Sequence, residues 1–549
     1  DRGHFLVHNF MNKLMLLLSS VLLLVALVSL PACSETSEKE SPTPVADFDP
    51  PDDCQQCHPV QHLEWQGSVM HYSALSPVFN AFELTVRELN SGAFSADGEA
   101  LPNFCIGCHS PISVANGETP GFDPNEEALP QSAFLSDLSL EALSCDFCHT
   151  VSGPDLTLAP MIGRLGDGIA NAAFLFAPNL FKNGPIPSPT SNDYHGSLDT
   201  DRGASNYLAT PEFCGSCHDV RLPVEDKVTG EPFRRLENLF SEWQEGPYNS
   251  EDNPFGKVIT CQDCHMSLYP LGAPGEYPTI AVSQTPEGEP GPLRKHALHA
   301  FTSVSIPFLD DPRLPNIDSD EVDQFGYPLG QQQRRELVLK SALAMSLEDT
   351  LTSIAPSATT IPIRITVTNV GAGHNVPSGF SQERQTWIEL IVEDDTGLLY
   401  ESGTLVDSTH PTESVVDGRL DDEDLRHEHF EICEYDFDTH VTHTDPLHPS
   451  PDYNEREEGT NLGLVIFTNR FIRIHTFDPS LPTCAPEDFC PSDPALKKRS
   501  GSAPNRTPAN GCNDPGYLDC GPEDVSDEHC WEPILNPAGA DHMDNAQSL

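Results

Sequence analysis

The sequence predicts a mainly α-helical, irregular domain, then a β-rich, sandwich-like domain, and last a disulfide-stapled tail. Three observations support this fold class. Between residues 51 and 330 a cysteine-containing pentapeptide recurs among turns rich in proline and glycine. From about residue 360 apolar and polar residues alternate, as they do in half-buried strands. The last part of the chain holds further cysteines but few apolar residues.

The chain is long and strongly acidic. It has 549 residues, enough for several domains, with 84 Asp and Glu residues against 29 Lys and Arg residues, a formal charge of -55. Such a surface disfavours nucleic acid and favours partner proteins that have a basic docking surface. Strong acidity is also typical of adaptation to salty surroundings, and composition alone does not separate the two explanations.

The N-terminal segment, residues 1–33, predicts export. Counted from Met11, it has a positive residue, an apolar run and a small-residue sequence that ends in Cys33. This pattern resembles a bacterial lipoprotein signal peptide, with Cys33 lipidated; an uncleaved anchor helix is the alternative. Residues 34–50 are polar and contain proline, as a tether does. We therefore expect a lipid-anchored protein of the periplasm or cell surface, and Ser34 favours the outer membrane over the inner.

Five copies of one pentapeptide, C-x-x-C-H, dominate the cysteine pattern. This is the attachment signature of c-type haem, in which two thiols form thioethers with one porphyrin and the next histidine ligates the iron. The predicted attachment cysteines are Cys54, Cys57, Cys105, Cys108, Cys145, Cys148, Cys214, Cys217, Cys261 and Cys264. The predicted proximal iron ligands are His58, His109, His149, His218 and His265.

Other uses of paired cysteines explain the pattern less well. Zinc sites do not require a histidine directly after every second cysteine. Thioredoxin-like motifs occur singly, near a βαβ pattern that this sequence does not have. Disulfides would leave the five histidines unexplained. The sequence therefore predicts a pentahaem cytochrome c domain over residues 51–330, with five covalent haems c as cofactors.

A second histidine for each iron is the next requirement. The histidines within or just beyond the attachment region are His62, His71, His195, His296, His299 and His374. His62 follows His58 by four residues and would share its helix, so it is left out. The predicted distal ligands are therefore His71, His195, His296, His299 and His374. Met70 and Met266 are thioether alternatives, although Met266 adjoins His265 and cannot easily reach across its own haem. Histidine on both faces of the iron predicts lower potentials than Met/His ligation does.

Residues 54–77 resemble the first haem unit of the large periplasmic multihaem cytochrome c family. This family includes the nitrifiers' tetrahaem cytochrome c, hydroxylamine oxidoreductase and octahaem tetrathionate reductase. A tryptophan, a serine and a histidine follow the first motif in these proteins, and the matching residues here are Trp65, Ser68 and His71. The resemblance implies that His71 ligates a haem.

The resemblance continues along the chain and covers residues 50–480. The later residues that carry it are Cys214, Trp243, Cys261, His374, Arg384 and Trp387. It is specific for haem binding and fold type but not for a substrate. It implies a pentahaem lipoprotein member of the family.

Residues 331–480 predict a helix and then the β-rich domain. The helix is expected at 331–343, and the strands are expected at 361–371, 386–403 and 462–474. His374 lies in the loop after the first of these strands. We expect this loop to reach back and cap a haem, and the alternative is a turn histidine in a glycine-rich loop.

The tail, residues 481–549, together with Cys433, contains the remaining unassigned cysteines. They are Cys433, Cys484, Cys490, Cys512, Cys520 and Cys530. Their even number in an oxidising compartment predicts up to three disulfides, whose pairing the sequence leaves open. The acidic residues 421–429 are a weak calcium candidate, because they lack a recognised loop spacing and also fit a solvated acidic face.

Two classes of function remain, with a third as a further alternative. The first is electron transfer through five six-coordinate haems to a redox partner protein. The second is a reductase or oxidase of a small inorganic nitrogen or sulfur compound, which needs one iron with an open position. Every motif ends in histidine and none in lysine, which favours electron transfer. The third is a subunit of an extracellular haem filament, against which the lipid anchor argues.

Replacing Cys33 with Ser should release the protein from membranes, because the lipid-bearing thioether can no longer form. Fractionation of cells followed by immunoblotting measures this, and Ser34→Ala serves as the control that keeps the lipidated residue. A Cys33→Ser protein that stays in the membrane fraction after its signal is removed would refute the lipoprotein interpretation.

Overall fold

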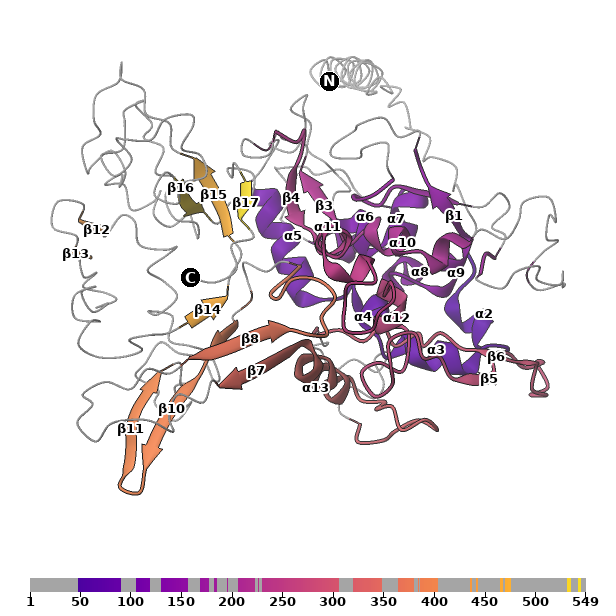
Figure 1. Ribbon diagram of the computed structural model, residues 1–549. Helices are drawn as coiled ribbons and strands as arrows, with labels where there is room; N and C mark the ends of the chain where they lie inside the picture. The colour runs from indigo at the N-terminus through magenta and orange to yellow at the C-terminus, as the bar shows by residue number, and fades with distance from the viewer. Residues whose placement is uncertain are drawn as a thin grey trace, which may run out of the picture. The chain divides into compact units, whose positions relative to one another are not determined.

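The structure is a computed structural model, shown in Figure 1. It describes residues 48–89, 105–118, 130–156, 168–176, 182–184, 195, 206–222, 226, 230–305, 319–347, 364–379, 384, 386–402, 435–436, 441–442, 465–467, 470–474, 531–534 and 542–544. The predicted signal peptide with Cys33, the acidic residues 421–429 and the cysteines from Cys433 to Cys530 lie outside the described residues. Contacts divide the chain into residues 1–46 with 115–117, and residues 47–114 with 118–549. Among the described residues no helix has both the length and the apolar character to cross a membrane.

Each C-x-x-C-H motif lies in a short helix or at its end. These helices are α2 (Pro51–Gln55), α6 (Ile106–His109), α9 (Cys145–Thr150), α10 (Pro211–Gly215) and α12 (Cys261–His265). Proline occupies the start of α2 and α10, where its fixed φ suits the first turn. At α9 the Ser144 side chain accepts the Phe147 N–H, and at α12 Thr260 and Asp263 form a capping box. Residues next to the cysteines therefore stabilise the first turns of these four helices.

The other helices connect the motif helices or follow them. They are α3 (Pro59–Gln66), α4 (Val69–Tyr72), α5 (Pro77–Leu89), α7 (Pro111–Ala115), α8 (Asp137–Leu140), α11 (Leu239–Glu245) and α13 (Gln331–Ala342), with 3₁₀ turns η1 (Gln131–Phe134), η3 (Asn206–Ala209) and η4 (Pro247–Asn249). The helix expected at 331–343 is confirmed as α13. Most of these helices are too short to be stable alone, so tertiary packing must hold them.

Three antiparallel strand pairs also lie among the described residues of the region that carries the motifs. They are β1 (Val151–Pro154) with β2 (Phe174–Phe176), β3 (Val220–Leu222) with β4 (Arg234–Glu237), and β5 (Thr279–Ala281) with β6 (Leu293–Lys295). Strand β1 follows the helix of the third motif directly, and β3 starts shortly after the fourth motif. The chain is therefore extended directly after the third motif and shortly after the fourth.

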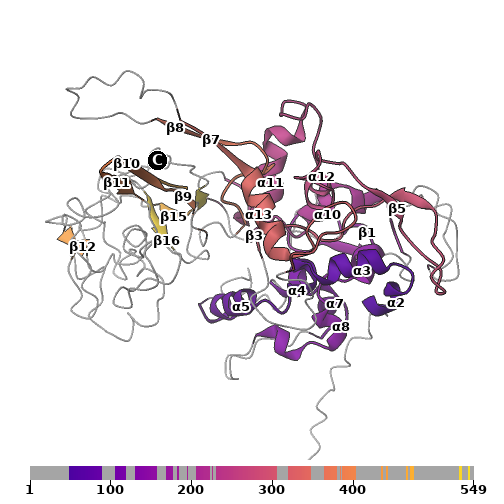
Figure 2. The ribbon, with the colours of Figure 1, turned by 90° about the horizontal axis from the view of Figure 1, so that it is seen from below.

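The strands of the C-terminal half are also antiparallel. The pairs are β7 (Leu343–Leu347) with β8 (Ile365–Asn369), β9 (Thr386–Ile388) with β14 (Val465–Phe467), β10 (Leu390–Asp394) with β11 (Gly397–Ser402), and β12 (Tyr435–Asp436) with β13 (Val441–Thr442). Strand β15 (Arg470–Ile474) lies between β16 (Trp531–Ile534) and β17 (His542–Asp544). Figures 1 and 2 show β10 and β11 as a hairpin, at the strand, turn and strand expected within 386–403. The sandwich arrangement stays a prediction.

The clearest apolar core of the described residues is built mostly from the chain that connects the fourth and fifth motifs, together with Ile169 and Ala170. Its buried residues are Ile169, Ala170, Phe240, Trp243, Tyr248 and Ile259, and Cys264 of the fifth motif packs against them. The Trp243 indole donates from Nε1 to the carbonyl of Ile259 at 2.7 Å. A buried indole thus keeps its hydrogen bond while its rings fill the core.

Gly215→Ala should destabilise the protein by about 1–3 kcal/mol, because it overpacks this core. Gly215 lies inside the fourth motif, and a Cβ there would lie 2.5 Å from Cδ2 of Phe240, whose ring is buried. Chemical denaturation of the purified protein measures the free energy of unfolding. Gly153→Ala is the control, since a Cβ at that residue meets nothing within 4 Å. Equal losses in both variants would contradict the packing explanation.

Candidate haem-binding sites

The histidines of the C-x-x-C-H motifs share a hydrogen-bonding pattern at Nδ1. In four motifs this nitrogen lies within hydrogen-bond distance of a backbone carbonyl oxygen. The pairs are His58 with Val282 at 2.9 Å, His109 with Ser73 at 3.0 Å, His149 with Asn183 at 2.7 Å and His265 with Thr302 at 2.6 Å. A carbonyl oxygen can only accept, so Nδ1 carries the proton and Nε2 keeps its lone pair. Metal-ligating histidines are oriented in this way by their second nitrogen.

Burial favours the neutral form of four motif imidazoles. It lowers the pKa of His109 and of His218 to about 4, and it also lowers the pKa of His149 and of His265. A protonated imidazole has no lone pair for a metal, so a neutral ring near pH 7 is ready to bind one. The residues present therefore fit the proximal ligand of a haem iron.

The thiols bring motifs together that are separate in sequence. All ten motif cysteines are half-buried. Each of three thiols shifts the pKa of a thiol in another motif: Cys145 lowers the pKa of Cys54, Cys108 raises the pKa of Cys217, and Cys214 lowers the pKa of Cys261. The first motif thus neighbours the third, and the fourth neighbours both the second and the fifth.

Two motif histidines each face a predicted distal histidine. The ring centroids of His58 and His195 lie 5.9 Å apart, and those of His149 and His299 lie 6.4 Å apart. Two imidazoles that share one metal ion have centroids about 6 Å apart, because each metal–nitrogen bond is about 2 Å long. Both distances therefore leave room for one metal ion between the rings.

His374 lies in the loop after β8, close to the fourth and fifth motifs. Burial, together with the neighbouring imidazoles of His265 and His218, lowers its pKa to about 4. Its Nδ1 lies 2.8 Å from the carbonyl oxygen of Asn375, which leaves Nε2 with a lone pair. The structure thus brings this loop to the haem-attachment region.

The loop that carries His374 is held by a buried carboxylate on α11. Glu242 Oε2 accepts the backbone N–H of Asn375 at 3.2 Å and the Ser378 hydroxyl at 2.5 Å. Burial raises the pKa of Glu242 to about 7. Arg384 donates from Nε to the Ser378 carbonyl at 3.1 Å, so it supports the same loop.

The other two predicted distal ligands lie against carboxylates. His71 Nε2 is 2.8 Å from Glu141 Oε2 without the alignment of a hydrogen bond, and its Nδ1 lies 3.0 Å from the Gln66 carbonyl. His296 Nε2 lies 2.9 Å from Glu64 Oε1. The role of both as iron ligands stays a prediction.

Glu64 also connects His296 with His299. Its Oε2 accepts the backbone N–H of His299 at 2.8 Å. The ligand atoms of Glu64, His296 and His299 all lie within 4.8 Å of one another, a spacing that a metal ion could bridge. His62, left out of the ligand set, is buried with Nε2 3.4 Å from Asp52 Oδ1.

The residues that carry the family resemblance have identifiable structural roles. The buried Trp65 indole donates to the Leu143 carbonyl at 2.8 Å, and its ring centroid lies 4.4 Å from that of His71. Ser68 is buried at the start of α4. Trp387 lies in β9, and its side chain is outside the described part of the chain.

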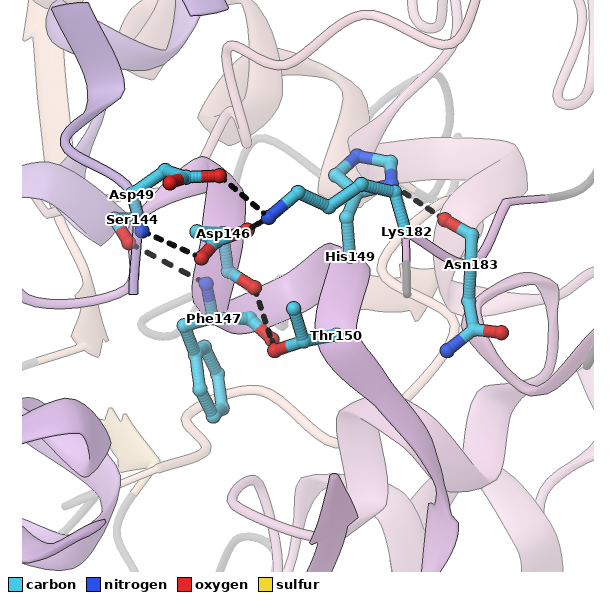
Figure 3. Close-up of polar contacts among 8 residues, drawn as sticks. All are labelled: Asp49, Ser144, Asp146, Phe147, His149, Thr150, Lys182 and Asn183. Carbon is cyan, nitrogen blue, oxygen red and sulfur yellow. Dashed lines mark hydrogen bonds and ion pairs between the residues drawn. The ribbon is translucent and has the colours of Figure 1, made fainter. Parts of the chain in front are cut away.

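Sequence reasoning missed the residues that hold the ligands from outside the motifs. These are Glu64, Lys182, Asn183 and Glu242. Figure 3 shows two of them, Lys182 and Asn183, against the third motif. Glu64 and Glu242 each begin a Glu-Trp-Gln sequence, at 64–66 and 242–244, and this repeat could have marked them. No local pattern marks Lys182 and Asn183.

Comparisons with known proteins give one distant likeness. No family model and no curated protein sequence matches the chain. Among solved structures, the crystal structure of a penta-heme cytochrome c552 from Thermochromatium tepidum is similar with a TM-score of 0.37 and 16% sequence identity. The match covers 66% of this chain and 75% of that chain.

If His374 is the predicted sixth ligand of one iron, His374→Ala should convert that haem of the oxidised protein from low-spin to high-spin. Low-temperature electron paramagnetic resonance (EPR) measures the change. His62→Ala is the matched control, since His62 is also buried but lies outside the predicted ligand set. An unchanged spectrum for His374→Ala would refute the assignment of this ligand.

Proposed function

We propose that this chain is a multihaem c-type cytochrome that binds five covalent haems and transfers electrons. The observation that carries the proposal is the Nδ1-to-carbonyl contact of four motif histidines, which leaves Nε2 free to ligate iron. A zinc site or a set of disulfides would not need histidines oriented in this way directly after each cysteine pair.

The chain's own residues would hold the haems and set their environment. The ten motif cysteines would form the thioethers, and the five motif histidines would supply the proximal ligands. The haem would supply one-electron exchange between ferric and ferrous iron. The backbone carbonyls fix four of these five rings, and the carbonyl contacts together with burial would tune the haem potentials.

Two facing histidine pairs support electron transfer over catalysis. His58 with His195 and His149 with His299 are spaced for ligation on both sides of an iron, which leaves no open position there. The thiol contacts between motifs support close spacing of neighbouring haems. We therefore favour a chain of mostly bis-histidine haems of low potential.

The acidic charge and the N-terminal sequence define the expected setting. A formal charge of -55 favours a redox partner protein with a basic docking surface and disfavours nucleic acid. The signal pattern that ends at Cys33 supports a location in the periplasm or at the cell surface, with a lipid anchor and the outer membrane favoured.

The haem count tests the proposal. The chain, exported by a host that matures c-type cytochromes, should show a Soret band and a denatured mass with five haem increments. The pair Cys214→Ala/Cys217→Ala should lose one increment, because one porphyrin loses both thioethers. Cys433→Ala, outside the motifs, is the control and should keep all five. Absence of the Soret band or of the mass increments would refute the proposal.

The spin state in the same preparation separates electron transfer from catalysis. Low-spin signals from all five haems support a pure carrier. A high-spin signal that shifts with nitrite or hydroxylamine would instead indicate an open, reactive iron.

A further inference from the structure

The third motif contains a buried ion pair. Asp146 lies between Cys145 and Cys148, and its side chain is 0% exposed. The Lys182 ammonium donates to Asp146 Oδ1 and, at 3.0 Å, to Asp49 Oδ2 (Figure 3). The backbone N–H of Asp49 donates to the second oxygen of Asp146 at 2.7 Å. The buried carboxylate is therefore satisfied by partners from two distant segments.

The residue after Lys182 contacts the motif histidine. The Asn183 carbonyl accepts the Nδ1 proton of His149 at 2.7 Å, and the Asn183 N–H donates to the His149 carbonyl at 2.5 Å (Figure 3). The Asn183 side chain also donates to the Val151 carbonyl at 3.1 Å. Lys182 is thus fixed by charge, and the adjacent residue, Asn183, holds the ring of the predicted iron ligand His149.

The ion pair is strong enough to matter for this contact. Removal of one partner of a buried pair leaves a desolvated charge, which costs several kcal/mol. The Lys182 side chain is only 18% exposed, so solvent screens its attraction to Asp146 little. Because Asn183 is the adjacent residue, the ion pair limits how far its carbonyl can move from Nδ1.

We propose that Lys182 is a positioning residue for the third haem site. Its pair with Asp146 holds the Asn183 carbonyl against His149, and this contact sets the potential of the haem on Cys145 and Cys148. A proton shared with a carbonyl makes the imidazole a stronger donor, which stabilises ferric iron. The inference rests on the proposed haem binding and goes beyond it.

The charge-neutral double variant Lys182→Met/Asp146→Asn tests the proposal. A single substitution at Lys182 would leave a lone negative charge near the haem, which also favours ferric iron and obscures the effect. The double variant should raise the reduction potential of one haem by about 59 mV. For a one-electron couple, this shift corresponds to an about tenfold loss in the relative stability of the ferric state. The g-values of one low-spin EPR signal should change with it.

Three further proteins make the result specific. Lys182→Arg keeps the charge and should keep the native potential. Lys340→Met/Glu336→Gln removes an exposed ion pair and should change no potential. Cys145→Ala/Cys148→Ala removes the third haem. The EPR signal missing from this variant therefore belongs to the third haem, and it should be the signal that changes in the double variant.

The outcomes are distinct. Five haems with unchanged potentials in the double variant would overturn the positioning role, as would an equal shift of all five potentials. If this variant fails to retain haem, the milder Lys182→Gln/Asp146→Asn is measured instead. A smaller rise in the potential of the third haem supports the positioning role, and an unchanged potential overturns it. Failure of haem binding itself is recognised separately, because the native chain would then carry no Soret band.

Discussion

The hydrogen bond from Nδ1 of a motif histidine to a backbone carbonyl is the constraint on which the rest of the site depends. It fixes the tautomer and the ring orientation together, so Nε2 points to where an iron would bind. The acceptors are backbone atoms of other segments, and the carbonyl of Val282 lies 224 residues from His58 in sequence. The remote segments must therefore pack together before the motif histidines can be oriented.

Buried charges support this arrangement from outside the motifs. Glu242 fixes the loop of His374, Glu64 contacts His296 and the backbone of His299, and Lys182 pairs with Asp146. Burial raises the pKa of Glu237 and of Glu242 to about 7. A strongly acidic chain thus uses some of its carboxylates internally, where each must find donors because water is excluded.

Local patterns were the most successful part of the sequence-based prediction. The helix α13 and the hairpin of β10 and β11 follow from helix-forming residues and from alternation around a turn with Gly397. The strand pairs β1 with β2 and β3 with β4 were not predicted. Their strands have only three or four residues, too few for a periodic pattern, and their partners lie across long connections.

The spacing of cysteine and histidine along the chain was enough by itself to predict where haem would attach, because a pentapeptide is a local feature. Only the tertiary structure decided which histidines meet. It placed His195 opposite His58 and His299 opposite His149, and it set His71 and His296 against carboxylates. The physical reason is distance in sequence: a distal ligand is selected by packing between remote segments, and composition and periodicity carry no information about that packing.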